Sequence, residues 1–160
     1  MVLRAAEPGD RAGILRIVRE VVDDGTTYVF AHDTPDAVLT DFFLDKAEHP
    51  FVAVRGGEVI GCYVVRRNHT GRGAHVANAA YVVGRAASGK GVGHAMGVHS
   101  LDEARRLGFS AMQFNFVVST NERAVALWRR LGFAEVGRLP RVFQHPTLGL
   151  VDALVMHRFL

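Results

Sequence analysis

A glycine-rich stretch separates a β-type run at residues 76–83 from a helical pattern that begins at residue 92, and it reads Ser88-Gly89-Lys90-Gly91-Val92-Gly93-His94. Glycine has no Cβ, so the backbone of such a loop can turn sharply and bring its N–H groups close to a ligand. The helix that follows presents its positive N-terminal end at the same place. This order of strand, loop and helix favours an α/β fold with an anion bound at the loop, against the alternative of a tight turn without a ligand.

Two common phosphate-binding motifs do not fit this loop. A P-loop needs Ser or Thr directly after its Gly-Lys pair, and Gly91 stands there, so the hydroxyl that would hold magnesium is missing. A dinucleotide fingerprint that starts at Gly91 needs a further glycine at position 96, where the chain has Met96. Nucleotide binding through either motif is therefore disfavoured, and a different anionic cofactor is expected.

Length and composition are typical of one globular domain over residues 1–160, with 49% hydrophobic and 22% charged residues. The single cysteine, Cys62, excludes an internal disulfide, and the eight histidines lack metal-ligand spacing, so no metal is expected. No apolar run approaches the roughly 20 residues that span a bilayer, and the first residues do not read as a secretory leader. We expect a cytoplasmic protein with no membrane partner.

The net charge of +3 raises the question of a nucleic-acid partner. The basic residues form separate pairs, such as Arg66-Arg67, Arg105-Arg106 and Arg129-Arg130, with acidic or apolar segments between them. A nucleic-acid site usually shows a continuous basic stripe with interleaved aromatic residues. No nucleic-acid partner is expected, and the positive charge suits an anionic cofactor such as coenzyme A.

The first half of the chain alternates helical and strand patterns. A short strand at 2–5 precedes Asp10, which is a good N-cap for a helix whose apolar residues recur over 14–22. Residues 26–34 show no periodicity, and Thr34-Pro35 then opens a second helix that continues to about Lys46. Runs at 51–54 and 59–65 around Gly56-Gly57 predict a hairpin, and a further strand follows at 76–83.

In the second half, helices and strands take turns. Helices are predicted over 92–107 and 121–131, each closed by a glycine, and strands over 112–118, 133–139 and 150–159. The last two strands are joined by a loop at 140–149. The predicted order is β-α-α-β-β-β-α-β-α-β-β, which corresponds to one mixed sheet with helices packed on it.

The chain resembles the GNAT family of N-acetyltransferases over its whole length. The glycine loop is similar to the family motif Arg/Gln-x-x-Gly-x-Gly/Ala, and residues 121–133 are similar to Asn-x-x-Ala-x-x-Leu-Tyr-x-x-x-Gly-Phe. The resemblance implies a mixed, mostly antiparallel sheet of about seven strands with about four helices, and acetyl-CoA as the acetyl donor. It also implies that the donor contacts Tyr81, Val82, Val83, Ser88, Gly89, Lys90, Gly91, Val92, Gly93, His94, Asn121, Trp128 and Arg130.

Three positions depart from the family pattern. Ser88 replaces the usual Arg or Gln at the start of the glycine motif. Trp128 stands where many members have a tyrosine that protonates the leaving thiolate, and an indole N–H does not ionise usefully near neutral pH. The strand at 76–83 carries Asn78 and no glutamate, so it offers no general base. Either a water relay removes the proton or the acceptor arrives neutral.

The acceptor side is predicted from polar residues in irregular or apolar surroundings. Asn115 interrupts an apolar strand, and a buried amide there either serves the reaction or is satisfied inside the protein. His145 lies in a proline-bounded loop and is either a substrate contact or a surface residue. The predicted acceptor contacts are Thr27, Tyr28, Asn78, Asn115 and His145, and the predicted catalytic groups are Asn115 and the backbone N–H of Val83.

Together these features predict an N-acetyltransferase in which the amine of a small molecule attacks acetyl-CoA directly in a ternary complex. Segments 114–121 and 139–146 with Asp152 resemble the subgroup that acetylates azetidine-2-carboxylate and proline analogues, which would make the acceptor an amino acid or analogue. The alternative is a non-catalytic acyl-CoA-binding sensor, because the usual acid and base are absent. A homodimer that shares its C-terminal strands is a further expectation from the resemblance.

Overall fold

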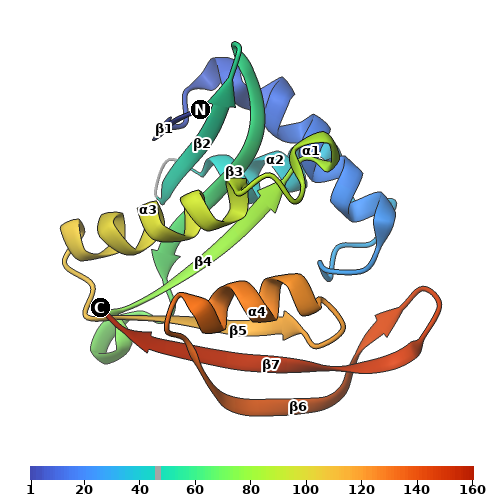
Figure 1. Ribbon diagram of the computed structural model, residues 1–160, viewed down its shortest axis with the longest axis vertical. Helices are drawn as coiled ribbons and strands as arrows, with labels where there is room; N and C mark the ends of the chain where they lie inside the picture. Colours follow the sequence, from blue (N-terminus) through green and yellow to red (C-terminus); the bar gives the residue numbers. More distant parts are fainter. Residues whose placement is uncertain (46–47) are drawn as a thin grey trace.

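The computed structural model describes residues 1–45 and 48–160 and has one seven-stranded sheet with helices on both faces (Figure 1). The strands follow the order β1-β2-β3-β4-β5-β7-β6, and neighbours are antiparallel except for the parallel pair β4 and β5. This confirms the predicted fold and order of elements. The elements are β1 (Val2–Ala5), α1 (Arg11–Asp24), α2 (Asp36–Leu44), β2 (His49–Arg55), β3 (Glu58–Arg67), β4 (Val76–Val83), α3 (Val92–Arg106), β5 (Ala111–Val118), α4 (Glu122–Arg130), β6 (Ala134–His145) and β7 (Gly149–Phe159).

Helices α1 and α2 cover one face of the sheet. Ile14, Ile17 and Val18 recur every three or four residues along α1, so they share one side of the helix and are buried against the strands. The helix ends at Gly25, whose φ of 67° is a left-handed conformation that glycine adopts without steric cost. None of the helices in the described part of the chain is long and apolar enough to cross a membrane.

Helices α3 and α4 cover the other face. Met96 of α3 and Trp128 of α4 are buried in the same core as Phe114 of β5. The two helices approach closely at Gly97, where a Cβ would lie 2.5 Å from Leu131 Cδ1. Glycine at this position therefore allows α4 to lie beside α3 at the end of the sheet where β4 and β5 separate.

Asp10 is the N-cap residue of α1, as predicted, but its carboxylate does not bind the end of this helix. Its carboxylate instead accepts two hydrogen bonds from the Arg4 guanidinium, at 2.7 and 2.8 Å, and one from the backbone N–H of Glu7 at 2.8 Å. The bidentate arginine pair uses both carboxylate oxygens, which explains why none is turned toward the helix end. The second helix begins near the predicted position and ends at Leu44, and Lys46 lies outside the described residues.

The predicted loop at 140–149 is also wrong for most of its length. Strand β6 continues to His145 and pairs again with β7 from Phe143 to His145, after a bulge between Leu139 and Phe143. In this bulge Arg141 has a φ of 54°, and its N–H donates to the Asp152 carboxylate at 2.9 Å. A bulge interrupts the alternation of side chains, so the pattern of the sequence did not show that the strand resumes.

Strands β4 and β5 form a fork. They are paired only at Val76 with Ala111 and at Ala77 with Met112, and beyond these two positions they part. Beyond the fork, β5 has a bulge between Phe114 and Val117 in its pairing with β7. The separation leaves one edge of β4 without a neighbouring strand, and this edge positions the candidate site.

Candidate active site

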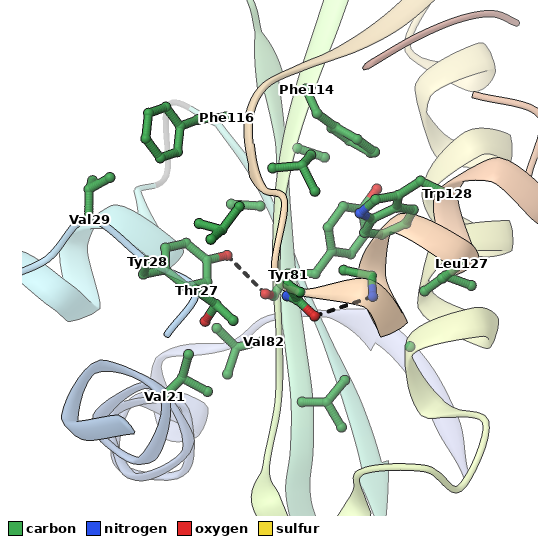
Figure 2. A pocket seen from close by; sticks show the side chains of 18 of the residues that line it. Val21, Thr27, Tyr28, Val29, Tyr81, Val82, Phe114, Phe116, Leu127 and Trp128 are labelled. Carbon is green, nitrogen blue, oxygen red and sulfur yellow. Dashed lines mark hydrogen bonds between the residues drawn. The ribbon is translucent and has the colours of Figure 1, made fainter. Parts of the chain in front are cut away.

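A cavity of about 580 Å³ occupies the fork between β4 and β5. Figure 2 shows Val21, Thr27, Tyr28 and Val29 on one side of β4, and Leu127 and Trp128 of α4 on the other. Both faces of β4 contribute, since Asn78 and Val82 point toward the α1 and α2 side while Ala79 and Tyr81 point toward α3 and α4. The cavity therefore reaches both faces of the sheet. The remaining lining residues are Phe30, Phe42, Ala80, Val83, Ser88, Gly93, Phe114, Asn115, Phe116, Val117, Val118, Asn121, Arg123 and Ala124.

The free edge of β4 offers backbone groups to this cavity. The N–H of Gly84 donates to the Ile60 carbonyl of β3 at 2.9 Å, and alternation then turns the polar groups of Val83 and Tyr81 away from β3. The carbonyl of Tyr81 is already used, because it accepts the Tyr28 hydroxyl at 2.9 Å (Figure 2). The N–H of Val83 is thus directed into the fork, where the sequence analysis expected a catalytic donor.

The glycine loop ends at the start of α3. Gly89 and Gly91 have φ values of 75° and 79°, which only glycine adopts readily, and Gly91 is the N-cap. In the described part of the chain no side chain caps this helix end, so the N–H groups of its first turn are available to an anion. Ser88 and Gly93 line the cavity. The side chain of Val92 is buried in the core, and Lys90 and His94 lie in the loop and first turn without lining the cavity.

Helix α4 supplies the opposite wall. The Asn121 side chain accepts the N–H of Ala124 at 3.3 Å, so this residue is an N-cap and lines the cavity as well. Trp128 is only 7% exposed, and the centroid of its ring lies 4.7 Å from the ring centroids of both Tyr81 and Phe114. Its position in this aromatic cluster supports a packing role. Arg130 is exposed and does not line the cavity, whereas Arg123 does and was missed by the sequence analysis.

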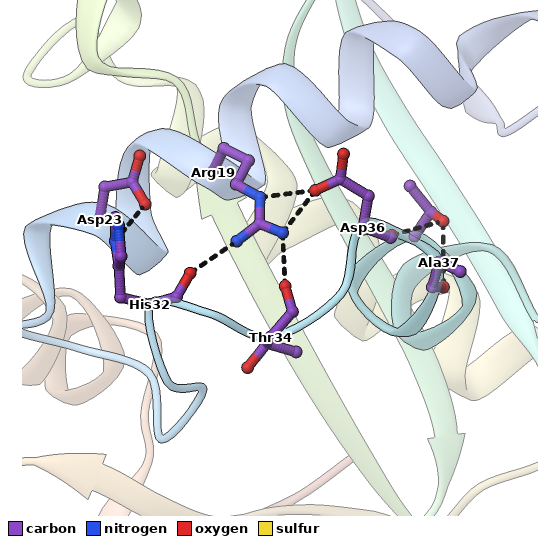
Figure 3. A network of polar contacts seen from close by, with 7 residues as sticks. Arg19, Asp23, His32, Thr34, Asp36 and Ala37 are labelled. Carbon is purple, nitrogen blue, oxygen red and sulfur yellow. Dashed lines mark hydrogen bonds and ion pairs between the residues drawn. The ribbon is translucent and has the colours of Figure 1, made fainter.

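The wall on the other side comes from the connection between α1 and α2. Arg19 holds this connection, since its guanidinium donates to the carbonyls of His32, at 3.0 Å, and Thr34, and to the Asp36 carboxylate at 2.7 Å (Figure 3). The connection carries Thr27 and Tyr28 to the cavity, as predicted for acceptor contacts.

Tyr28 belongs to an aromatic group in this wall. Its ring stacks on Phe30 with centroids 5.9 Å apart, and Phe30 meets Phe42 edge-on at 5.1 Å. Burial raises the pKa of Tyr28, and likewise that of Tyr81, well above the ordinary tyrosine value. Both hydroxyls therefore stay protonated near neutral pH, and neither acts as a base.

A chain of amide side chains runs along the mouth of the fork. Asn78 Nδ2 donates to the backbone carbonyl of Gln113 at 2.9 Å. The side chain of Gln113 continues the chain, since its Nε2 donates to Asn115 Oδ1 at 2.9 Å, and Asn115 Nδ2 donates to Asn68 Oδ1 at 2.7 Å. Asn115 lines the cavity, but the expectation that it is buried is wrong, because the bulge in β5 turns it to the exposed side. Sequence reasoning missed Asn68 and Gln113, which no local pattern connects with the site.

His145 is the last residue of β6, directly before the turn to β7, and is not among the residues that line the cavity. Its Nδ1 accepts the N–H groups of Thr147 and Leu148, both at 3.2 Å, so the ring shapes the hairpin. Arg123 is the one charged residue among the described residues that line the cavity, and no carboxylate or histidine is among them. The lining thus offers backbone and amide hydrogen bonds rather than a titrating acid or base.

Comparison with known proteins identifies the family of a chain with this fold and fork. Residues 15–133 match the acetyltransferase (GNAT) family. The chain belongs to this family. Its members take an acetyl group from acetyl-CoA, so the chain is an acetyltransferase with acetyl-CoA as its donor.

Individual relatives agree with this assignment. A GCN5-related N-acetyltransferase from Kribbella flavida has 42% identity and a TM-score of 0.95, covering 99% of this chain and 97% of that one. The N-acetyltransferase aca1 of Schizosaccharomyces pombe is 33% identical over 61% of this chain, which spans 47% of that protein. A phosphinothricin acetyltransferase from Sinorhizobium meliloti, solved with acetyl-CoA, has 24% identity and a TM-score of 0.87 over 99% of this chain and 88% of that one, which shows the shared fold.

Proposed function

We propose that residues 1–160 form a single GNAT acetyltransferase domain that transfers the acetyl group to the amine of a small molecule by direct attack in a ternary complex. The observation that carries the proposal is a cavity that reaches both faces of the sheet through the fork. A donor can enter from the α3 and α4 side and an acceptor from the α1 and α2 side. The two molecules then meet beside the free edge of β4.

The donor side suits the parts of acetyl-CoA. The pyrophosphate is proposed to bind the open N–H groups between Gly89 and His94, at the positive end of α3. The pantetheine arm then runs along residues 81–83, where the backbone groups that β5 leaves unpaired, other than the Tyr81 carbonyl held by Tyr28, can bind its amides. Asn121 faces this arm from α4. Lys90 is exposed within this loop and Arg130 is exposed at the end of α4, and we propose that both supply positive charge for the phosphates.

The chemical step needs little more than position and one hydrogen bond. The amine nitrogen attacks the thioester carbon, and the Val83 N–H stabilises the negative charge that develops on the carbonyl oxygen. The C–N bond forms, the C–S bond breaks, and the amine proton reaches the coenzyme A sulfur through water. This route uses no general acid at Trp128, in agreement with its packed position.

The acceptor is proposed to contact Thr27, Tyr28, Asn78 and Asn115, and the resemblance makes amino acids and proline analogues the first acceptors to examine. The test follows thiol release from acetyl-CoA with amino acids, azetidine-2-carboxylate, polyamines and aminoglycosides, beside a calorimetric titration of acetyl-CoA. Turnover of one class supports the enzyme and names its acceptor. Tight binding of acetyl-CoA with no turnover of any amine would favour the acyl-CoA sensor, which the missing acid and base motivate.

We also propose that the protein forms a homodimer through its C-terminal strands. Strand β6 is the last strand of the sheet, so one of its edges has no neighbouring strand. Its exposed side chains include Val136 and Val142, which are 59% and 44% exposed. Light scattering tests this proposal, and a monomer at every concentration measured would refute it.

A further inference from the structure

Asn78 occupies the strand position nearest to the mouth of the fork, one residue beyond the last pair between β4 and β5. Its Nδ2 donates to the Gln113 carbonyl at 2.9 Å. A carbonyl oxygen only accepts hydrogen bonds, so the NH₂ group of Asn78 must face Gln113 and its Oδ1 must face away from it. Asn78 lines the cavity, and Oδ1 has no hydrogen-bond partner among the described residues. The strand therefore presents a fixed neutral acceptor where an amine would approach.

The surroundings disfavour a positively charged amine. No aspartate, glutamate or histidine is among the described residues that line the cavity. Arg123, the one charged residue in the described part of the lining, is itself positive, and the Arg66 guanidinium lies 4.2 Å from the centroid of the Phe42 ring. Phe42 lines the cavity, so a cation that enters would meet an aromatic ring that already binds the Arg66 cation.

Arg66 keeps a positive charge beside the aromatic residues of the acceptor side. Arg66 is half-buried and donates to the Phe42 carbonyl at 2.8 Å, and its buried Nε has no hydrogen-bond partner among the residues that the structure describes. Burial lowers the pKa of Arg66, while Glu48 and Asp45 act in the opposite direction, and an arginine keeps its charge at neutral pH. Arg66 does not line the cavity, so it does not contact a molecule inside. Its positive charge acts on such a molecule electrostatically, across Phe42 and Tyr28.

From this arrangement we infer that the acceptor is a weakly basic amine that is neutral at physiological pH, with an apolar or aromatic body, and that Asn78 Oδ1 accepts one of its N–H groups. The inference rests on the proposed acetyl transfer. The body of the acceptor lies against Tyr28, Phe30, Phe42 and Phe116. The nitrogen keeps its lone pair for the thioester carbon while one N–H bonds to Asn78.

A neutral amine also removes the need for a base. Acetylation of a neutral amine releases one proton, which the departing coenzyme A thiolate takes up, so the protons balance within the reacting pair. Acetylation of an ammonium releases two protons, and one must reach solvent before attack, because the described residues of the lining include no carboxylate to accept it. An amino acid or proline analogue then reacts only through its small neutral fraction.

The test compares two amines of similar shape, O-benzylhydroxylamine, which is neutral near pH 7, and benzylamine, which is protonated there. Thiol release from acetyl-CoA is followed from about pH 6 to about pH 9, with blanks that lack enzyme. We expect a flat kcat/KM profile for O-benzylhydroxylamine and a roughly tenfold rise per pH unit for benzylamine, as its neutral fraction rises. At neutral pH, kcat/KM for O-benzylhydroxylamine should exceed kcat/KM for benzylamine at least about 100-fold.

Two variants assign the effect to Asn78. Asn78→Asp places a carboxylate in the cavity and should reduce the preference at neutral pH about tenfold or more, mainly by raising kcat/KM for benzylamine. Gln144→Glu is the control, since it adds the same charge at an exposed residue of β6 that does not line the cavity. We expect the control to keep the wild-type preference.

The outcomes separate this inference from the function on which it rests. Benzylamine turnover at neutral pH equal to that of O-benzylhydroxylamine would overturn the neutral-acceptor class and leave acetyl transfer intact. A wild-type preference that Asn78→Asp does not change would overturn the role of Asn78. Binding of acetyl-CoA with no turnover of these amines or of the wider panel would overturn the proposed enzyme and this inference with it.

Discussion

Replacing Tyr28 by phenylalanine removes one hydroxyl from the acceptor wall and keeps the ring. The lost interaction is the 2.9 Å hydrogen bond to the carbonyl of Tyr81. Such a bond contributes about 0.5–1.5 kcal/mol, and a buried carbonyl left without a donor costs about 1–3 kcal/mol. The freed carbonyl faces a cavity that water can enter, so we expect the free energy of unfolding to fall by about 1–2 kcal/mol. Urea unfolding measures this loss.

The same bond holds the α1–α2 connection against β4, so the kinetic effect should fall on the acceptor. About 1 kcal/mol corresponds to roughly fivefold in an equilibrium constant, and we expect the acceptor KM to rise about fivefold to tenfold. The Kd of acetyl-CoA should not change, because Tyr28 lies on the opposite side of β4 from α3 and α4.

Tyr63→Phe provides the matched control. Tyr63 is a buried tyrosine whose hydroxyl is hydrogen-bonded to His99, and it does not line the cavity. It should lose a similar free energy of unfolding with no change in the acceptor KM. A rise in the acceptor KM for Tyr63→Phe equal to that for Tyr28→Phe would refute the reasoning, since general loosening rather than the wall would then explain both.

Three further variants probe other parts of the structure. Gly91→Ala forces a side chain into a φ of 79°, which should cost about 1–2 kcal/mol and weaken acetyl-CoA binding in a calorimetric titration. Trp128→Ala should lower the free energy of unfolding by about 3–5 kcal/mol, measured in urea, because it empties a buried aromatic cluster. The Arg4 hydrogen bonds hold the pKa of Asp10 below its usual value, so their contribution is present above the ordinary carboxyl pKa and is lost as the pH falls through the lowered one. Arg4→Met should therefore be about 1 kcal/mol less stable near neutral pH, and urea titrations should show the difference disappearing once the pH falls below the lowered pKa of Asp10.

The sequence predicted most of the fold because its helices and strands carry regular apolar patterns. Strand β4 was predicted with its observed bounds, and both Gly56 and Gly57 adopt the positive φ expected of the hairpin turn. The errors fall where a competing contact or a bulge overrides the local signal of the sequence. Asp10 is a suitable N-cap by residue type, but Arg4 from the neighbouring strand takes its carboxylate.

The candidate site was predictable in its donor half and much less so in its acceptor half. The donor half depends on a contiguous loop, and Ser88 and Gly93 both line the cavity. The acceptor half depends on the bulge in β5, which turns Asn115 outward, and on contacts between residues far apart in the chain, such as Asn115 with Asn68. Bulges and cross-strand amide contacts leave no periodic signal, so only the folded chain shows them.

The fork also gives a structural reason for the proposed transfer without ionisable groups. Two strands that are paired at only two positions and then part leave a row of backbone groups that would otherwise be bonded to each other. At the next position along β4, the side chain of Asn78 donates to the backbone carbonyl of Gln113, where a backbone hydrogen bond would otherwise join the strands. Further along β4, the backbone groups of Tyr81 and Val83 are directed into the cavity. Their directions are set by β3, which is paired with β4 along its whole length. A donor amide and a thioester carbonyl placed against this edge complete the missing ladder, so binding itself aligns the reacting carbon with the acceptor side.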